Sequence, residues 1–456
     1  MFTNRITNVP YIPRLSAFAD SRDMIRNPIE VFERYRARLG HTFTFHFGGA
    51  KPAIVSTHPD FIQHVLKKNH QNYHKSDIQV KRMGEFQGQG LLNSHDEYWL
   101  RQRRFLQRGF KRDHISALLP IMQQVMAESM RSFDAEVTKG PVDIHQQMVA
   151  FTLRLVGKSL FGNSMKDAEL EQLGQTIATI QSFIVHQIVQ PYKIPWYKLS
   201  GQSRRYQRMR IEADNIVRKY IEERRGSSEV GNDLLQVFMD SRYKDDNSQM
   251  TDEQILIESL QLLVAGNETS SNALSWTLYL LSRHPEHLKL MREEMKQILH
   301  GKLLNFADLH RLTYTAQVLD EAMRLYPPFW MVDRVALQND EIMGIRIPAG
   351  ITVIPYIYGT HRNLDFWEQP EVFDPDRFVT ENKKARHQFA HIPFGGGPRV
   401  CIGSNLAIIQ MLLILVHLIQ RYDFQPISET PVAIKPMMIL RPDGAIKLQF
   451  NPRSCK

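Results

Sequence analysis

Apolar side chains along the middle of the chain recur with the period of an amphipathic helix. From about Asp60 to His310 most segments carry this periodicity, and short polar loops separate them. The clearest helix begins near Thr251, where Thr251-Asp252-Glu253-Gln254 has the pattern of a capping box. Apolar positions continue up to His284-Pro285, which predicts about 30 helical residues, or roughly 45 Å at the helical rise. A helix of this length crosses a whole large domain.

Alternating polar and apolar residues predict strands near both ends of the chain. Thr42–Phe47 alternates, Gly48-Gly49 can turn, and Ala53–Val55 continues a hairpin. The tail, Pro431–Phe450, predicts strands around a Pro442-Asp443-Gly444 turn. We therefore expect a mainly α protein with small β-sheets (α+β), whose β-rich parts lie near 40–57 and 430–450.

The length of 456 residues, without repeats or a long Gly/Ser linker, predicts one large domain over residues 1–456. Apolar residues make up 43% and charged residues 23%, which excludes a disordered or collagen-like chain. The net charge of +9 is modest for this length. It permits an acidic partner and does not require nucleic acid.

The two cysteines, Cys401 and Cys455, exclude a disulfide framework and a Cys-rich zinc site, and they favour a reducing compartment. Met1–Asp23 holds charges and prolines without an apolar core, so we read no signal peptide or membrane anchor there. The apolar run Leu406–Ile419 is too short to span a bilayer and predicts a buried helix. A soluble, cytoplasmic protein is expected.

The strongest chemical signal surrounds Cys401. The segment from Phe394 to Gly403 reads FGGGPRVCIG, and the odds of a chance match to its FxxGxRxCxG spacing are on the order of 10⁻⁴. Glycines let backbone N–H groups approach a sulfur closely. A helix start behind Cys401 would stabilise a thiolate, which a soft metal prefers, and Arg399 can pair with an anionic group of a cofactor. A lone cysteine in a turn would more often be a buried small apolar residue.

This segment resembles the haem-binding loop of the cytochrome P450 family of haem-thiolate monooxygenases. The resemblance implies haem b (iron protoporphyrin IX) as cofactor, with Cys401 as the axial iron ligand and Phe394 and Gly395 against the haem. It also implies the family's fold, a triangular prism with a long central helix over the haem. The resemblance covers the whole chain, with its motifs in the family's order.

The pair Glu321 and Arg324 forms an ExxR that is weak by itself, because the spacing recurs at Glu33, Glu128 and Glu222 and usually marks a solvated helix face. Its setting distinguishes it, since Pro327-Pro328 follows and Arg377 comes shortly before the Cys401 segment. In the resembled family this order builds a Glu–Arg–Arg core that locks the cysteine loop. The resemblance implies a structural role for Glu321, Arg324 and Arg377.

A third signal, Ala265-Gly266-Asn267-Glu268-Thr269-Ser270, lies midway along the predicted long helix. Glycine weakens a helix interior, and Thr or Ser can bond the carbonyl four residues back, which suggests a local opening at a ligand site. A crossing of two helices through small residues is the alternative. The segment resembles the family's oxygen-activation motif. That implies Glu268 and Thr269 as the catalytic acid–alcohol pair for proton delivery, and Ala265 and Gly266 as residues that make room for O₂.

Trp99 and Arg103 form a WxxxR whose side chains share one helix face. A core tryptophan or a cation–π contact is the commoner meaning of this spacing. In the resembled family the pair contacts a haem propionate, and Arg334 takes a similar role. The resemblance therefore implies Trp99, Arg103, Arg334 and Arg399 as propionate ligands.

The resemblance also indicates which residues line the substrate pocket. It implies an apolar, methionine-containing wall, which suits a hydrophobic substrate, although most apolar residues are simply core. The candidates are Phe183, Phe329, Trp330, Met331, Met437 and Met438.

The implied activity is insertion of one oxygen atom from O₂ into a hydrophobic small molecule. No flavin, nicotinamide or ferredoxin motif occurs, so we expect no fused reductase. We expect electrons derived from NAD(P)H to arrive through a ferredoxin or flavodoxin with its reductase. If Trp99 to Arg112 is one helix, then Arg101, Arg104, Arg108 and Lys111 form a basic stripe for that acidic partner. A solvated face is the alternative to a docking stripe. A peroxide-using peroxygenase or a haem-thiolate ligand sensor is the alternative function, and neither needs the acid–alcohol pair.

Overall fold

The computed structural model describes residues 9–47, 51–228 and 230–453 and divides the chain into two compact units. The first unit comprises Met1–Asp77, Gln317–Cys401 and Ile434–Asp443. The second comprises Ile78–Ala316, Ile402–Ala433 and Gly444–Lys456. Each unit is assembled from stretches that lie far apart in the sequence, and the single domain over 1–456 stays a prediction.

The first unit holds the β-rich part of the chain. Its strands are β1 (Thr42–Phe47), β2 (Lys51–Ser56), β3 (Tyr73–His74), β5 (Arg334–Ala336), β6 (Asp340–Ile342), β7 (Ile345–Ile347), β8 (Thr352–Pro355), β10 (Ile434–Pro436) and β11 (Leu440–Pro442). Its helices are α1 (Arg14–Ala19), α2 (Ser21–Arg26), α3 (Pro28–Leu39), α4 (Pro59–Gln63), α16 (Ile357–Thr360) and α17 (Thr380–Ala385), with helical turns at His64–Lys68, His70–Asn72, Pro375–Phe378 and Gly397–Arg399.

The second unit is mainly helical. Its helices are α5 (Asp77–Gln87), α6 (Asp96–Leu106), α7 (Arg112–Val137), α8 (Ile144–Phe161), α9 (Asp167–Val189), α10 (Ile194–Leu199), α11 (Gln202–Gly226), α12 (Leu234–Asp240), α13 (Asp252–Arg283), α14 (Pro285–Leu299) and α18 (Ser404–Arg421), with turns at Pro191–Lys193 and Asp308–His310. Its strands are β4 (Val142–Asp143), β9 (Tyr422–Pro426) and β12 (Lys447–Pro452). Helix α15 (Thr313–Leu325) begins in this unit and ends in the first.

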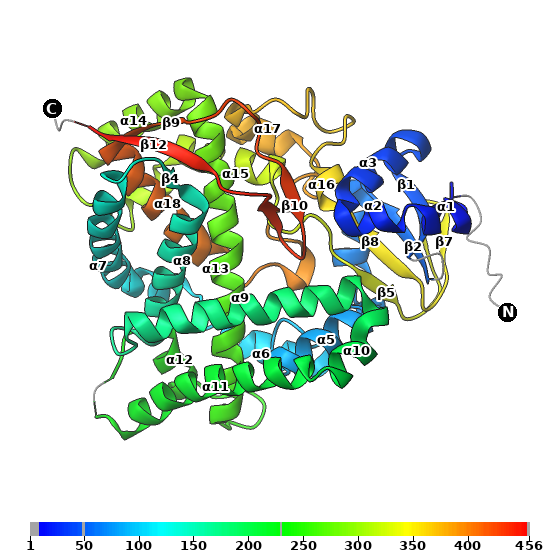
Figure 1. Ribbon diagram of the computed structural model, residues 1–456, viewed down its shortest axis with the longest axis horizontal. Helices are drawn as coiled ribbons and strands as arrows, with labels where there is room; N and C mark the ends of the chain where they lie inside the picture. The colour runs from blue at the N-terminus through cyan, green and yellow to red at the C-terminus, as the bar shows by residue number, and fades with distance from the viewer. Residues whose placement is uncertain (1–8, 48–50, 229, 454–456) are drawn as a thin grey trace. The chain divides into compact units, whose positions relative to one another are not determined.

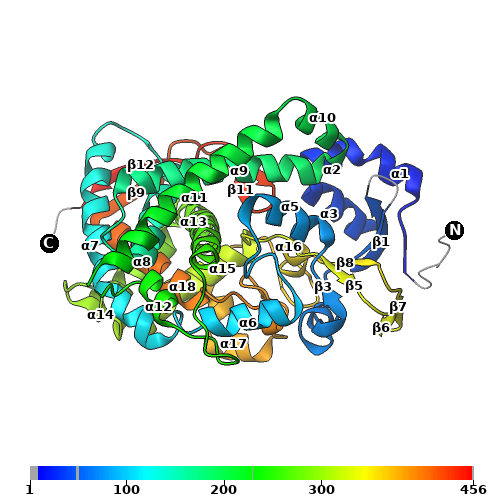
Figure 2. The ribbon, with the colours of Figure 1, turned by 90° about the horizontal axis from the view of Figure 1, so that it is seen from below.

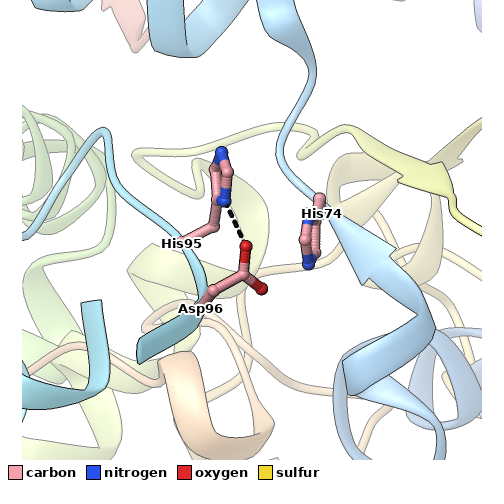
Figure 3. Close-up of side chains that lie close together, drawn as sticks. All are labelled: His74, His95 and Asp96. Carbon is pink, nitrogen blue, oxygen red and sulfur yellow. Dashed lines mark hydrogen bonds and ion pairs between the residues drawn. The ribbon is translucent and has the colours of Figure 1, made fainter. Parts of the chain in front are cut away.

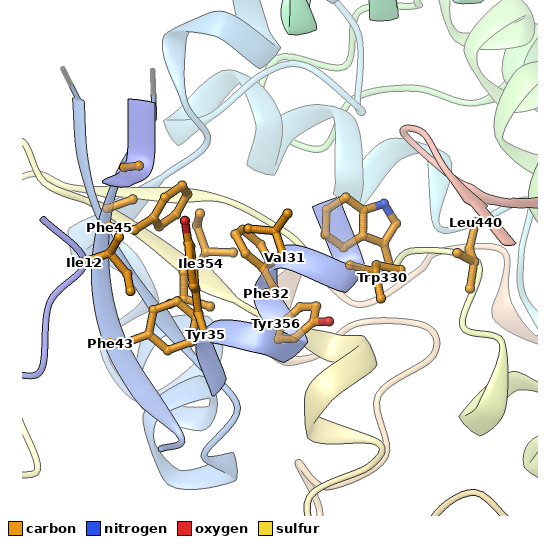
Figure 4. Packing of buried hydrophobic residues seen from close by; sticks show 14 residues of the cluster. Ile12, Val31, Phe32, Tyr35, Phe43, Phe45, Trp330, Ile354, Tyr356 and Leu440 are labelled. Carbon is orange, nitrogen blue, oxygen red and sulfur yellow. The ribbon is translucent and has the colours of Figure 1, made fainter. Parts of the chain in front are cut away.

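The main sheet of the first unit has the order β1-β2-β8-β5-β3. The predicted strands near 40–57 are β1 and β2, which pair antiparallel from Thr42↔Ser56, while the Gly48-Gly49 turn lies outside the described residues. Helix α3 packs on this sheet through Phe32, whose ring makes edge contacts with Phe45 and Tyr356, each at 5.2 Å between centroids. Figure 4 shows this aromatic core, which Trp330 joins.

Helix α13 confirms the long helix expected from Thr251, and its 32 residues run against α8 (Figure 1). The Thr251 side chain accepts a hydrogen bond from Gln254 N at 3.2 Å, as the capping pattern predicts. The reciprocal half of the capping box is wrong, because Gln254 Oε1 accepts instead from the Tyr98 hydroxyl at 2.7 Å, and Gln254 Nε2 donates to Gln89 O and Glu258. Helices α9 and α11 also pack on one another (Figure 2).

Two other expectations need correction. Strands β11 and β12 do flank the turn Pro442-Asp443-Gly444 as predicted, but they do not form a hairpin, because β11 pairs with β10 whereas β12 pairs with β9 and β4. The segment from Trp99 to Arg112 is not one helix either, since α6 ends at Leu106. Turns with hydrogen bonds between residues three positions apart then lead to α7. At this break a Cβ on Gly109 would lie 2.9 Å from Leu234, so close packing against α12 bends the chain there.

The apolar run at Leu406–Ile419 forms the buried part of α18, as expected, but the helix is longer than the run and covers 18 residues. Among the described residues, α18 alone is long and apolar enough to cross a membrane, and 61% of that stretch is buried inside the protein. That share of burial fits a core helix.

Candidate functional site

The Cys401 loop closes on itself through backbone hydrogen bonds in the first unit. Cys401 N donates to Phe394 O at 3.0 Å, and Gly395 N donates to Ile392 O at 2.9 Å. Gly397 has φ +68°, and a Cβ there would lie 1.8 Å from Leu66 O, so only glycine fits. Cys401 itself is exposed, and helix α18 starts shortly after it at Ser404. The loop therefore presents an accessible thiol on a tightly held backbone.

A group of cations that the motifs only partly predicted lies in the same unit. Arg334 is buried, and its only acceptor among the described residues is Asp333 O at 2.7 Å. Burial and the guanidinium groups of Arg334 and Arg399 lower the pKa of Lys75 to about 7, while the carboxylate of Asp333 opposes that fall. Lys75 is thus repelled by the charges of Arg334 and Arg399 and attracted by that of Asp333. An anionic ligand would stabilise this group of cations.

Lys75 was missed by sequence reasoning because it belongs to no motif. Strand β3 pairs antiparallel with β5 as Tyr73↔Ala336 and His74↔Val335, and the next step of this register brings Lys75 beside Arg334. A two-residue strand gives no readable pattern in the sequence, so only the sheet reveals this neighbour.

The predicted Glu–Arg–Arg core is formed by contacts in the first unit. Glu321 and Arg324 are fully buried and pair at 2.6 Å, and Arg324 also donates to the carbonyl oxygens of His361 and Pro370. Arg377 Nε lies 3.5 Å from Glu321 Oε1. Burial raises the pKa of the Glu321 carboxyl, and the hydrogen bond from Arg324 opposes this rise. This network fastens the end of α15 to the segment that precedes the Cys401 loop.

In the second unit, α13 has a stretch of partly accessible residues, Val264–Thr269, within an otherwise mostly buried helix. Thr269 Oγ1 donates to Ala265 O at 2.6 Å, the bond to the preceding turn that the sequence suggested. A Cβ on Gly266 would lie 3.0 Å from Val156, so this glycine serves the close crossing of α13 over α8. Glu268 is partly exposed beside Thr269.

The same helix carries a buried carboxyl outside every predicted motif. Glu258 accepts hydrogen bonds from Leu91 N at 3.2 Å and 3.1 Å. Burial raises the pKa of Glu258 to about 7, although the Leu91 N–H opposes that rise. Glu258 thereby fastens the loop between α5 and α6 to α13.

Helix α6 carries Trp99 and Arg103 one turn apart, with Trp99 buried and Arg103 partly exposed. Gln102 fixes this helix by donating to Tyr243 Oη at 3.0 Å. Figure 3 shows the His95–Asp96 pair at its N-terminus, where His95 Nδ1 lies 2.6 Å from Asp96 Oδ2. Trp99 and Arg103 belong to the second unit, and Arg334 and Arg399 belong to the first.

The predicted pocket residues divide into two kinds. Phe183 is buried and stacks on Tyr206 at 3.9 Å, and Trp330 is buried and donates from its indole N–H to Met437 O at 2.7 Å. Both are packed among other side chains, and their place in the substrate pocket stays a prediction. Phe329, Met331, Met437 and Met438 keep partial exposure and stay candidates.

Comparisons with known proteins agree with these features. A model of the cytochrome P450 family matches residues 10–450. The chain is 30% identical to cytochrome P450 3A41 of Mus musculus over 444 residues, which cover 93% of this chain and 86% of that protein. It is 29% identical to cyclooctat-9-en-7-ol 5-monooxygenase of Streptomyces melanosporofaciens over 84% of this chain and 82% of that protein. The crystal structure of the cytochrome P450DA heme domain has the same fold, with a TM-score of 0.87, 23% identity and coverage of 98% and 97% of the two chains.

The chain belongs to the cytochrome P450 family. With relatives that are named monooxygenases, it is a P450 monooxygenase, and the family implies a haem-iron cofactor, O₂, a substrate and a redox partner. The residues in the first unit fit such a cofactor. The exposed thiol of Cys401 offers a soft ligand for iron, and the Lys75, Arg334 and Arg399 cations suit propionate carboxylates.

Proposed function

We propose that the enzyme inserts one oxygen atom from O₂ into a hydrophobic organic substrate, with electrons from a separate carrier protein. The observation that carries this proposal is the Glu268–Thr269 pair on the accessible stretch of α13. An acid and an alcohol side by side can pass protons to a reduced oxygen species. A peroxygenase or a ligand sensor has no use for such a pair, which makes those alternatives less suitable.

Haem b, when bound, would supply the redox chemistry with oxygen, held by Cys401 at the iron and by Lys75, Arg334 and Arg399 at the propionates. Phe394, Gly395, Trp99 and Arg103 are proposed as further haem contacts. The hydroxyl of Thr269 donates to Ala265 O at 2.6 Å, so its lone pairs can accept a hydrogen bond from a neighbouring donor, and its own proton would pass on when the bond to Ala265 O is exchanged. Glu268 would replenish that proton from solvent, since it is partly exposed.

The substrate class rests on the partly exposed apolar residues Phe329, Met331, Met437 and Met438. Flexible methionine side chains adapt to hydrophobic molecules of varied shape. A cysteine-poor chain fits the reducing conditions of the cytoplasm, which we propose as its location.

Thr269→Ala is expected to divert electrons from product to peroxide. Removing the hydroxyl removes the proton relay, and product formed per electron should fall by about tenfold or more. Substrate affinity and haem content should stay unchanged. The measurement is the ratio of product and peroxide to electrons consumed under steady turnover.

Thr277→Ala is the matched control for this variant. Thr277 Oγ1 makes the same bond to the preceding turn, at 2.7 Å to Ala273 O, but its side chain is fully buried. Its loss should leave the product ratio unchanged, whereas Thr269→Ser should restore it. An unchanged ratio in Thr269→Ala would contradict proton delivery by Thr269.

The electron carrier is proposed to be an acidic ferredoxin or flavodoxin. Because α6 ends at Leu106, the four residues of the predicted basic stripe do not all lie on one helix. Arg101 pairs with Asp246 at 2.8 Å, and Arg108 donates to Arg242 O at 2.6 Å, so part of the expected stripe is engaged within the protein. Arg104 and Lys111 remain exposed. These two cations are the better candidates for steering an acidic partner.

Reversing both charges, Arg104→Glu with Lys111→Glu, is expected to slow reduction by an acidic carrier about tenfold at low salt. The slowing should fade as salt rises, because exposed charges are screened over about 10 Å at 0.1 M. Stopped-flow reduction at several ionic strengths measures this effect. Each single reversal is compared with Lys139→Glu, an exposed reversal near the end of α7 that changes the net charge equally, and equal slowing by that control would show that no docking surface exists here.

A further inference from the structure

A cluster of metal-ligating side chains lies at the corner where α13 ends and α14 begins, apart from every residue assigned above. His284, Glu286 and His287 each direct one ligand atom into it, and these atoms lie within 4.8 Å of one another. His284 Nδ1 lies 3.3 Å from Glu286 Oε1, and His287 Nε2 lies 3.9 Å from the same oxygen. Ligand atoms around a tetrahedral zinc ion are about 3.4 Å apart, given bonds of about 2.0–2.2 Å. Small side-chain movements would complete that geometry.

The backbone of this corner is held in place before any ion binds. Pro285 starts α14, His284 N donates to Leu281 O at 3.3 Å, and His287 N donates to His284 O at 3.1 Å. The two imidazole rings lie 5.9 Å apart between centroids. The ligands therefore come from one short, hydrogen-bonded segment.

The other ring nitrogen of His287 also has a hydrogen-bond partner, as metal-binding histidines do, and here the partner is the hydroxyl of Tyr314. His287 Nδ1 lies 2.6 Å from Tyr314 Oη, so Nε2 faces the carboxylate of Glu286. Tyr314 is itself fixed, because its backbone N–H donates to Glu294 of α14 at 2.6 Å. With Nδ1–H as the donor and Tyr314 Oη as the acceptor, this hydrogen bond holds the ring orientation and leaves Nε2 unprotonated to bind the ion.

The basic residues that flank this cluster in the sequence contact other partners. Arg283 donates to the carbonyl oxygens of Ser428 and Glu429, and Lys289 lies 4.0 Å from Glu293. The Glu286 carboxylate is 60% exposed, so one side of the cluster is open to water. Two imidazoles, one carboxylate and a water form a ligand set that suits zinc.

We propose that His284 Nδ1, Glu286 Oε1 and His287 Nε2 bind one zinc-type divalent ion, with water as the fourth ligand and Tyr314 as a positioning residue. The ion would join the end of α13 to the start of α14. This site is separate from the proposed catalytic chemistry and does not depend on it.

Equilibrium dialysis of the tag-free, haem-loaded protein against zinc tests the proposal. We expect one saturable zinc ion per chain. Glu286→Gln and His287→Asn should each weaken its binding tenfold or more, and Tyr314→Phe should weaken it about tenfold. X-ray absorption at the zinc edge should show two histidine ligands in the wild type and one in His287→Asn. In Tyr314→Phe the number of histidine ligands on zinc should stay at two at saturating zinc. An unfolded variant would lose these ligands.

Two matched controls separate this cluster from other surface histidines. His114→Asn removes an exposed histidine of α7, and His95→Asn removes a histidine whose pairing with the carboxylate of Asp96 is drawn in Figure 3. Both should bind zinc like the wild type. The proposal is overturned if no saturable binding occurs, if the His287 and Glu286 variants bind zinc normally, or if either control abolishes binding.

Discussion

Replacing Cys401 with alanine is expected to abolish the strongly red-shifted absorbance band that carbon monoxide gives with the reduced holoprotein. That band needs a thiolate on the iron. Cys401 is the one cysteine among the described residues, its side chain is exposed, and its loop is closed by a hydrogen bond to Phe394 O at 3.0 Å. No neighbouring side chain of this loop can replace a thiolate, so the expected loss is complete.

Cys401→His tests the same assignment with a ligand that can still hold haem. This variant should keep haem but move the carbon monoxide band to the shorter wavelength of a histidine ligand. Cys455→Ala should keep the original band. Retention of the band in Cys401→Ala, or its loss in Cys455→Ala, would assign the iron ligand to the other cysteine.

Local patterns in the sequence were enough to predict helix α13. Its start depends on a Thr251 hydroxyl and its end on Pro285, and both act within a few residues of the chain. The side chain of Gln254 could not be placed in the same way. It bonds Gln89 and Glu258 instead of its own helix start, and Gln89 is brought near only by the fold.

The break after Leu106 shows the same limit. The composition of residues 99–112 suits a continuous helix, but Gly109 packs against Leu234, which is distant in sequence. As a result, the four basic residues of the expected stripe do not share one helix face. Arg101 and Arg108 find partners in the segment 242–246, which no helical periodicity could reveal.

Spacing alone also could not rank the four ExxR segments. Glu33 and Arg36 pair at 2.5 Å on the partly exposed face of α3, whereas Glu128 pairs with Arg154 and Arg225 pairs with Asp252. Only Glu321 and Arg324 are fully buried together. The order of motifs along the chain selected this buried copy, whereas spacing could not, because burial depends on residues that follow Glu321 by some 40 to 50 positions, such as His361 and Pro370.

Arg324→Ala is expected to produce the largest loss of stability among single substitutions discussed here. It would remove the closest partner of the buried Glu321 carboxylate, leave it with Arg377 at 3.5 Å, and remove the donors to the carbonyl oxygens of His361 and Pro370. Breaking one side of a buried ion pair costs about 3–5 kcal/mol. The free energy of unfolding in urea, followed by circular dichroism, measures this loss, and haem content should fall with it because the network leads to the Cys401 loop.

Arg36→Ala provides the matched control, since Glu33 and Arg36 have the same spacing and a 2.5 Å contact but keep 27% and 21% exposure. Its cost should stay below about 1 kcal/mol, because solvent screens a partly exposed pair. The double variant Glu321→Ala with Arg324→Ala should cost less than the sum of its single variants, since it leaves no lone buried charge. If Arg324→Ala and Arg36→Ala cost the same, burial does not decide the strength of this pair, and the structural role of Glu321 and Arg324 is contradicted.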